Sequence, residues 1–305
     1  MTYGTESKGN EFVPEILLNH SHEEADTLIL LHALTVNKDA ELVIDSPDTD
    51  VFLLMIHMYS KLPIATSFLT GKSTQKKTIA IQPIFNKIGK KQASAILGFH
   101  AFTGSDMCGR FAGRTKDWCV KVFLLCDDQI LNALASLGLS SPSPETCLHL
   151  ERFVCLLYKS KMYSTVQDLR WYLYSNRGAE GESLPPTLGS LTPHILRAHY
   201  IAMIWAKAIE SHPFLPSPVN FGWNYDATTK TFVPVRCLHT PAPEAILQLV
   251  KCSCKKGCKG NCSCRNNRIP CTEVCGCIGY SCCNKPVEVS ETNIDEDETD
   301  EEYEI

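Results

Sequence analysis

The chain has 305 residues, which is enough for two or three domains at roughly 100–200 residues each. Hydrophobic residues make up 44% of it and charged residues 21%, so most of the chain can bury a core. No apolar run approaches the roughly 20 residues that a membrane-spanning helix needs, and the polar first residues lack the apolar segment of a secretory signal. These features exclude a membrane partner and predict a nuclear or cytoplasmic protein.

Charge is distributed unevenly along the chain. The formal net charge is −5, yet residues 285–305 hold ten Asp and Glu against one Lys. The remaining residues carry 28 Lys and Arg against 24 Asp and Glu, a slight positive excess. A dense run of like charges repels itself and cannot bury apolar surface. We therefore predict a disordered acidic tail that attracts basic protein partners.

The first part of the chain predicts helices that alternate with short buried strands. Ser21, followed by Glu24 three residues later, is typical of a capping box that begins a helix. Alternation of this kind is typical of an α/β layer with a parallel sheet. In chain order, the expected elements are a helix over 28–34, a strand over 41–45, a helix over 51–59, a strand over 78–81 and a helix over 91–99.

Acidic side chains cluster at the ends of these elements. Asp48 and Asp50 follow the first expected strand and, two positions apart in extended chain, point to the same side. Glu24 and Asp26 begin the first expected helix, and Asp106 lies in the loop over 103–106. Ligands for parallel sheets bind beyond the carboxyl ends of the strands, and hard carboxylate oxygens suit Mg²⁺ or Mn²⁺. Such a site can activate water against a phosphodiester.

Three motifs in order resemble the flap-endonuclease (XPG-like) branch of the PIN-type 5′ nucleases. They are Glu24-Ala25-Asp26, Ser46-Pro47-Asp48-Thr49-Asp50 and Gly104-Ser105-Asp106, and the similarity covers about residues 20–120. The resemblance implies that the metal ligands are Glu24, Asp26, Asp48, Asp50 and Asp106. It also implies that the stretch 109–116, which resembles the family's DNA-gripping element, contacts phosphates through Arg110, Arg114 and Lys116.

The motif order departs from that family at its start. There, a first strand and a first aspartate lie well upstream of the acidic pair, whereas only about twenty residues precede Glu24 here. The resemblance therefore implies a domain truncated at its N-terminus. Taken alone, each acid has a simpler interpretation, in which Glu24 is the capping-box residue, Glu23 and Asp26 complement the helix dipole, and Asp48 caps the helix that follows it.

The middle of the chain predicts a scaffold. Residues 145–212 show helical periodicity over 147–158 and 166–174, and again over 194–210 after Ser183-Leu184-Pro185-Pro186. Residues 213–243 are rich in proline and aromatic side chains and predict an irregular connector packed on the helices. No functional motif stands out in this region.

Cysteines are concentrated near the end of the chain. Ten of the sixteen fall in the pattern C-x-C-x3-C-x3-C-x-C-x6-C-x3-C-x-C-x4-C-C. Two thiolates separated by one residue can bind one metal ion, whereas they would form a strained disulfide. Few apolar residues lie between them, so metal must supply the folding energy. The predicted zinc ligands are Cys252, Cys254, Cys258, Cys262, Cys264, Cys271, Cys275, Cys277, Cys282 and Cys283.

This pattern resembles the CXC domain, also called the tesmin/TSO1 or CRC type, over residues 252–284. The resemblance implies three Zn²⁺ ions held by nine bridging and terminal cysteines, with either Cys282 or Cys283 as the last ligand. Six Lys and Arg against one Glu in residues 251–284 would attract a phosphate backbone, and a purely structural role is the alternative. A disulfide-rich secreted module is a further alternative. The basic residues expected to contact DNA are Lys255, Lys256, Lys259, Arg265 and Arg268.

Together these features predict a DNA-binding zinc protein with a metal-dependent, structure-selective nuclease-like domain, as in a group of transposon-derived animal proteins. The alternative is a non-catalytic DNA-binding or interaction scaffold of the same origin. The predicted organisation comprises a disordered or partial segment (1–20), a truncated PIN-like α/β domain (21–135), a helical extension and connector (136–250), a CXC module (251–284) and an acidic tail (285–305).

Overall fold

The computed structural model describes residues 20–72, 75–177, 179 and 181–239, and residues 252–255, 258, 262–266, 271 and 275–277 of the cysteine-rich segment. The chain divides into two units, one ending at Leu238 and one beginning at His239. The predicted α/β domain and most of the helical extension therefore lie in one unit. The acidic tail and the predicted ligands Cys282 and Cys283 lie outside the described residues.

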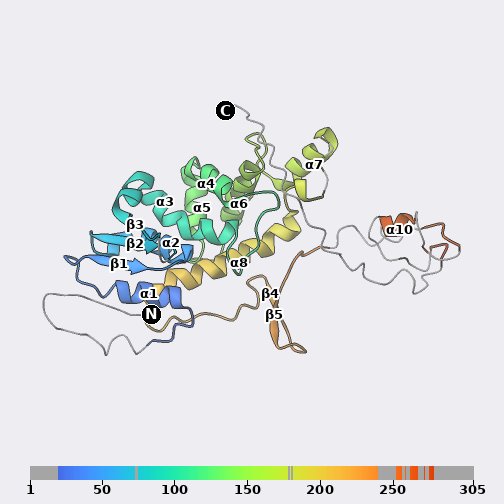
Figure 1. Ribbon diagram of the computed structural model, residues 1–305. Coiled ribbons are helices and arrows are strands. Elements are labelled where there is room, and N and C mark those ends of the chain that lie inside the picture. Colours follow the sequence, from blue (N-terminus) through green and yellow to red (C-terminus); the bar gives the residue numbers. More distant parts are fainter. Residues whose placement is uncertain are drawn as a thin grey trace. The chain divides into compact units, whose positions relative to one another are not determined.

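The first unit is a mixed α/β structure with a three-stranded sheet and a separate two-stranded hairpin (Figure 1). The strands of the three-stranded sheet are β1 (Leu42–Asp45), β2 (Thr66–Thr70) and β3 (Lys77–Ala80), hydrogen-bonded in that order. The pairing of β1 with β2 is parallel, in register Ile44 with Phe68, and this confirms the expected parallel arrangement in part. The pairing of β2 with β3 is antiparallel, because the two strands are joined by a short hairpin connection that reverses the chain.

Helices form most of the unit. Those of its first half are α1 (Ala25–Ala33), α2 (Thr49–Met58), η1 (Tyr59–Lys61), α3 (Ile81–Thr103), α4 (Lys116–Leu124) and α5 (Asp128–Ser136). Those of its second half are α6 (Pro144–Leu157), α7 (Val166–Arg177), η2 (Gly181–Ser183), α8 (Leu188–Ala206) and η3 (Lys207–Ile209). The sequence predicted α1, α2, α6, α7, α8 and the second half of α3, and it missed β2, α4 and α5.

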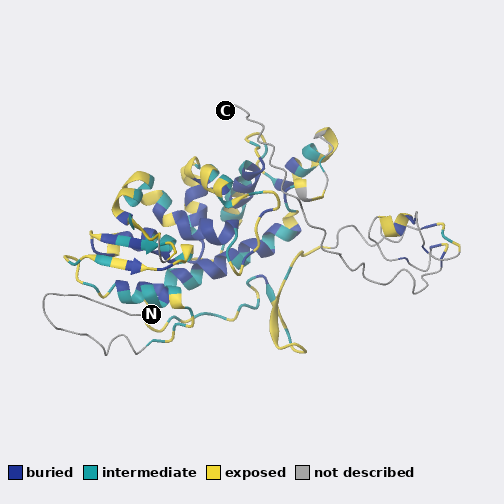
Figure 2. Cartoon of the chain, in the orientation of Figure 1, coloured by how far each residue is buried: buried dark blue, intermediate teal, exposed yellow. Residues whose placement is uncertain are grey.

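Helix α3 organises the core. It breaks at Gly89, whose φ of 83° is readily adopted by glycine, and its second half from Ala93 to Thr103 is largely buried. That half packs against α2, α5 and α8, so helices from both halves of the unit share one hydrophobic core. Figure 2 shows the buried residues concentrated where these helices meet.

Most helix starts follow the local rules of capping. The side chains of Thr115, Asp127, Ser143 and Thr187 each accept a hydrogen bond from the backbone N–H three residues later. The predicted capping box at Ser21 is wrong: α1 has Glu24 at its N-cap position without a side-chain cap. The Ser21 amide instead donates to the Ser211 carbonyl at 3.0 Å, so this residue belongs to a contact with the end of the helical region.

The segment after α8 contains a β-hairpin, β4 (Trp223–Asp226) and β5 (Thr231–Pro234), where an irregular connector was expected. It is tied to α8, because the Arg197 guanidinium donates to the carbonyls of Gly222 and Val235 at 3.1 and 2.7 Å. Pro193 lacks an amide that could donate to the Gly189 carbonyl. The Leu238 amide donates to the Gly189 carbonyl instead, at 2.9 Å, so the end of this unit packs on α8.

Candidate metal centres

Three of the five predicted carboxylates lie together in the first unit. Ligand oxygens of Asp26, Asp48 and Asp50 are all within 4.8 Å of one another. Asp26 lies in the first turn of α1, and the other two follow β1 at the start of α2. The group therefore lies beyond the carboxyl end of a strand that is parallel to its neighbour, where α/β sheets place their sites.

The loop between β1 and α2 is fixed by short-range hydrogen bonds. The Asp48 amide donates to the buried Ser46 hydroxyl at 3.0 Å, and the Asp50 amide donates to Oδ1 of Asp48 at 2.8 Å. Asp48 is thus the N-cap of α2, as one of the simpler interpretations proposed. A cap uses a single oxygen, so this role leaves the second carboxylate oxygen of Asp48 for a cation.

The crowding of acids has an electrostatic cost. Burial, followed by the charges of Asp48, Asp50 and Asp106, raises the pKa of Asp26 to about 6. Burial and the neighbouring acids, with Asp26 first among them, also raise the pKa of Glu24. Helix dipoles at the starts of α1 and α2 favour carboxylates there, yet they do not offset this repulsion. A bound divalent cation would remove it, which is the physical case for a metal site.

Glu24 and Asp106 lie at the margin of the group. Both interact electrostatically with Asp26, but neither contributes an oxygen to the group within 4.8 Å. Asp106 is exposed in a tight turn that is closed by two hydrogen bonds between Ser105 and Cys108, of 3.0 and 3.1 Å. Asp26, Asp48 and Asp50 therefore form a group of three carboxylates. Glu24 and Asp106 lie close enough to interact with this group through their charge.

A histidine that the sequence did not single out as functional supports the group. Nε2 of His100, in the buried half of α3, lies 2.7 Å from Oδ1 of Asp50. The imidazole is 7% exposed and stacks on Trp205 with ring centroids 5.4 Å apart. Carboxylates that ligate metals are commonly held by such a second hydrogen bond. Fifty residues separate His100 from Asp50, so no local pattern could have paired them.

We expect His100→Leu to lower the Mn²⁺ affinity of the chain by at least about tenfold, because Asp50 loses the donor that orients it. His100→Gln keeps a donor and should recover part of the affinity. His57→Leu is the control, since Nδ1 of His57 bonds the Ala93 carbonyl away from the acids. Electron paramagnetic resonance of free Mn²⁺ measures the affinity. Equal affinities for wild type and His100→Leu would contradict this role.

Asp26→Asn should stabilise the chain at pH 7.5 in buffer without added divalent metal. The raised pKa of Asp26 means that folding is penalised as pH rises from about 4, its ordinary value, through about 6. After discounting for solvent screening of a half-exposed group, we expect a gain of about 1 kcal/mol, or about 2–4 °C in melting temperature. Below pH 4 the gain should vanish.

The unfolding of this unit can be followed by tryptophan fluorescence, because all four tryptophans, at 118, 171, 205 and 223, lie before residue 239. Asp117→Asn is the matched control: it also removes a charge from the first turn of a helix, α4, but outside the group. A loss of stability in Asp26→Asn equal to that of the control would show that the acids do not repel one another.

Two of the three predicted phosphate contacts take part in internal interactions. The Lys116 ammonium donates to the carbonyls of His100 and Gly104 and to the Thr103 hydroxyl at 2.7–3.1 Å, so it caps the end of α3. Burial lowers the pKa of Lys116 to about 8. The Arg114 guanidinium stacks over Tyr158, 4.4 Å from the ring centroid. Arg110 is exposed. Of the three, it is the residue whose position best suits a phosphate contact.

The second unit contains a cluster of buried cysteines. Of its eight described cysteines, all but half-buried Cys254 are buried, and none forms a disulfide. The Sγ atom of Cys252 lies 3.8, 3.8 and 3.7 Å from the Sγ atoms of Cys258, Cys271 and Cys277, respectively. A zinc ion with Zn–S bonds of about 2.3 Å places its sulfurs about 3.8 Å apart in a tetrahedron. These separations therefore fit a metal-thiolate cluster.

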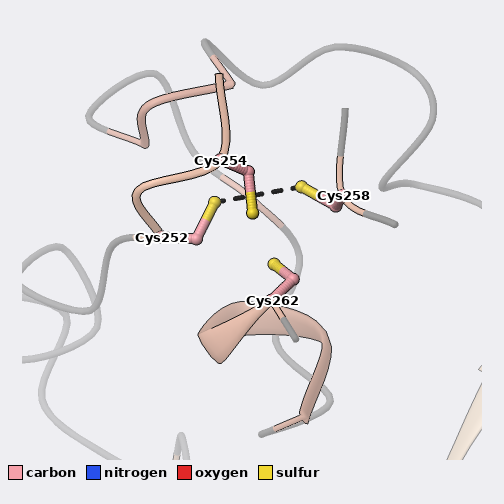
Figure 3. Close-up of side chains that lie close together, drawn as sticks. All are labelled: Cys252, Cys254, Cys258 and Cys262. Carbon is pink, nitrogen blue, oxygen red and sulfur yellow. Dashed lines mark hydrogen bonds between the residues drawn. The ribbon is translucent and has the colours of Figure 1, made fainter. Parts of the chain in front are cut away.

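The sulfurs form three overlapping groups of four. Figure 3 shows the first, in which the side chains of Cys252, Cys254, Cys258 and Cys262 converge on one point. Cys252 belongs to all three groups, and Cys258 and Cys271 each belong to two. The other groups are Cys252, Cys258, Cys271 and Cys277, and Cys252, Cys264, Cys271 and Cys275. Sharing of this kind is expected when thiolates bridge several ions in one cluster.

Local backbone contacts bring the cysteine pairs together. The Gly276 amide donates to the Cys252 carbonyl at 2.7 Å, and a Cβ at Gly276 would lie 3.0–3.2 Å from the backbone of 252–254. Glycine therefore allows two C-x-C pairs to lie side by side. The short helix α10 (Ser263–Asn266) carries Cys264, and its Arg265 donates to the Cys258 carbonyl. Lys256, Lys259 and Arg268 lie outside the described residues.

None of the helices in the described parts of the chain is both long and apolar enough to cross a membrane. Comparison of the chain with protein-family models, with curated proteins and with solved structures gave no match. The resemblances to PIN-type nucleases and to CXC domains therefore rest on the motifs of the chain itself. The geometry adds one group of three carboxylates and one cluster of thiols, each suited to a metal ion.

Proposed function

We propose that this chain is a zinc protein that binds nucleic acid and hydrolyses phosphodiester bonds with a divalent cation at Asp26, Asp48 and Asp50. The observation that carries the proposal is the convergence of these three carboxylates within 4.8 Å at the carboxyl end of β1. Their hard oxygen atoms match Mg²⁺ or Mn²⁺. A bound ion of this kind would supply charge stabilisation and an activated water.

The residues of the chain have separate parts in this proposal. Asp48 and Asp50 are held by the start of α2 and by His100, which keeps their oxygens in place before an ion arrives. Asp26 reaches the same point from α1 and, with its pKa raised to about 6, would exchange a proton for the cation near that pH. Exposed Arg110 follows the Asp106 turn and would hold a phosphate of the strand.

The cysteine cluster has a different role. Zn²⁺ with thiolate ligands in a closed tetrahedral set contributes folding energy and no chemistry. The basic residues around it would then be presented to a phosphate backbone, through Lys255 and Arg265 among the described residues. This module would add affinity for DNA and leave the hydrolytic site to the first unit.

The test is cleavage of branched and single-stranded-flap DNA by the full chain with its zinc, with and without added Mn²⁺. The proposal predicts cutting that requires Mn²⁺ or Mg²⁺ and that is stronger on branched than on plain duplex DNA. Binding without cutting in either metal would reject the hydrolytic part of the proposal and leave a nucleic-acid-binding protein. The absence of both would reject the whole.

A further inference from the structure

A second feature of the first unit lies outside the carboxylate group. A cleft of about 530 Å³ is bounded by the loop over 109–112, the end of α6, α7, the segment 181–187 and the start of α8. Four arginines line it: Arg110, Arg170, Arg197 and Arg236. Among the described residues no Asp or Glu lines this cleft. The side chains of Glu180 and Glu182, which flank Gly181 in sequence, lie outside the described residues.

Two of the four arginines are held in place by backbone carbonyls, without neutralisation. Arg170 donates to the Pro185 carbonyl, and Arg197 donates to the carbonyls of Gly222 and Val235. Carbonyls orient a guanidinium but carry no net charge. None of the four arginines forms an ion pair with a described carboxylate. Arg170 and Arg197 are half-buried, and this burial lowers the pKa of both guanidinium groups.

Neutral donors and a helix start complete the lining. Thr187, the N-cap of α8, and Ser190 in its first turn both line the cleft, so the positive end of a 19-residue helix adds to the arginine charge. Tyr158 also lines it, and its hydroxyl donates to the Ala112 carbonyl at 3.1 Å. His194 does not add charge, since burial lowers its pKa to about 4. Concave shape, concentrated positive charge and hydroxyl groups are the features that bind phosphate.

We propose that this cleft binds a phosphate ester, as the phosphates of a nucleotide or of a nucleic acid strand. Its volume falls within the range of roughly 300–1,000 Å³ that small-molecule sites occupy. Several guanidinium groups around one cleft suit a ligand with more than one negative charge. The proposal does not depend on metal binding by Asp26, Asp48 and Asp50.

The test uses Arg236→Glu and Arg110→Glu, because both side chains are exposed and both substitutions leave the core intact. Lys121→Glu is the matched control: it makes the same charge change at an exposed position of α4 outside the cleft. The full chain with its zinc is titrated, in buffer without Mg²⁺ or Mn²⁺, with ADP and with a short single-stranded DNA. Tryptophan fluorescence follows binding, because all four tryptophans belong to the first unit.

Each cleft variant should weaken binding on the order of tenfold and lower the salt dependence of strand binding by about one phosphate contact. Lys121→Glu should change the affinity for either probe by less than about twofold. If the cleft variants weaken binding of the DNA strand alone, the natural ligand is a nucleic acid. If they weaken binding of ADP as well, it is a nucleotide-sized ester. No effect on either probe, or an equal effect of Lys121→Glu, would overturn the proposal.

Discussion

Asp48→Asn combined with Asp50→Asn should reduce Mn²⁺-dependent cleavage of flap DNA by about 1,000-fold, because a metal centre contributes several kcal/mol to such reactions. Two of the three clustered carboxylates would lose their charge while keeping their shape. Asparagine is preferred to alanine because Asp48 caps α2, and asparagine caps a helix about as well as aspartate. The measurement is the single-turnover rate with the enzyme in excess.

The control removes two exposed acids from outside the group. Asp39→Asn with Asp117→Asn makes the same change in net charge, and both side chains are exposed away from the three carboxylates. Its cleavage rate should stay within about twofold of wild type. If both double variants lost activity equally, net charge would be responsible and the assigned site would be wrong. Retained activity in the Asp48 and Asp50 variant would also reject the site.

Cys252→Ser should remove most of the zinc from the chain. Cys252 is the one described cysteine that belongs to all three groups of four sulfurs, so its loss leaves every group one ligand short. Structural zinc contributes roughly 10–16 kcal/mol of folding energy in small modules, and we expect the second unit to lose its fold. Zinc content by native mass spectrometry measures the effect.

Two further variants calibrate the zinc result. Cys254→Ser changes a ligand of a single group and should leave part of the zinc bound. Cys237→Ser changes an exposed thiol of the first unit and should leave all of it. Cys252→Ser with the same zinc content as Cys237→Ser would contradict the shared cluster. Equal losses from Cys252→Ser and Cys254→Ser would show that the cluster forms only as a whole.

Parts of the carboxylate site were predictable because they depend on local geometry. Asp48 and Asp50 follow a short apolar strand and begin a helix, so strand and helix periodicity alone place them at one edge of the sheet. Their convergence with Asp26 depends on how α1 packs against α2, which only the similarity in motif order suggested. The contact between His100 and Asp50 depends on the packing of α3 and has no local signal.

The missed elements share a physical reason. Strand β2 has one buried large side chain, Phe68, among threonine, serine and leucine, so its period-two pattern is weak. The hairpin of β4 and β5 is exposed on most of its surface and is held by backbone bonds and by pairing of Tyr225 with Phe232. The arginine cleft gathers residues from position 110 to position 236, which no local pattern relates.

The cysteine module was the most predictable part because its spacing encodes its contacts. Each C-x-C pair can offer two sulfurs to one centre, and glycine and proline between the pairs allow the tight turns. The structure confirms that the eight described sulfurs of this module cluster, and Cys252 belongs to all three of their groups. Spacing could not identify Cys252 as the shared ligand, because which sulfur is shared depends on how the turns pack against one another.

The most direct test of the account is Mn²⁺ binding to the zinc-loaded full chain, followed by electron paramagnetic resonance, in wild type and in the Asp48→Asn, Asp50→Asn variant. The account predicts on the order of one tightly held Mn²⁺ per wild-type chain and none at the same concentration in the variant. It also predicts weaker binding at pH 5 than at pH 7.5, since the proton on Asp26 competes with the ion. Equal Mn²⁺ binding by the two proteins would contradict the assignment of the three carboxylates as a metal site.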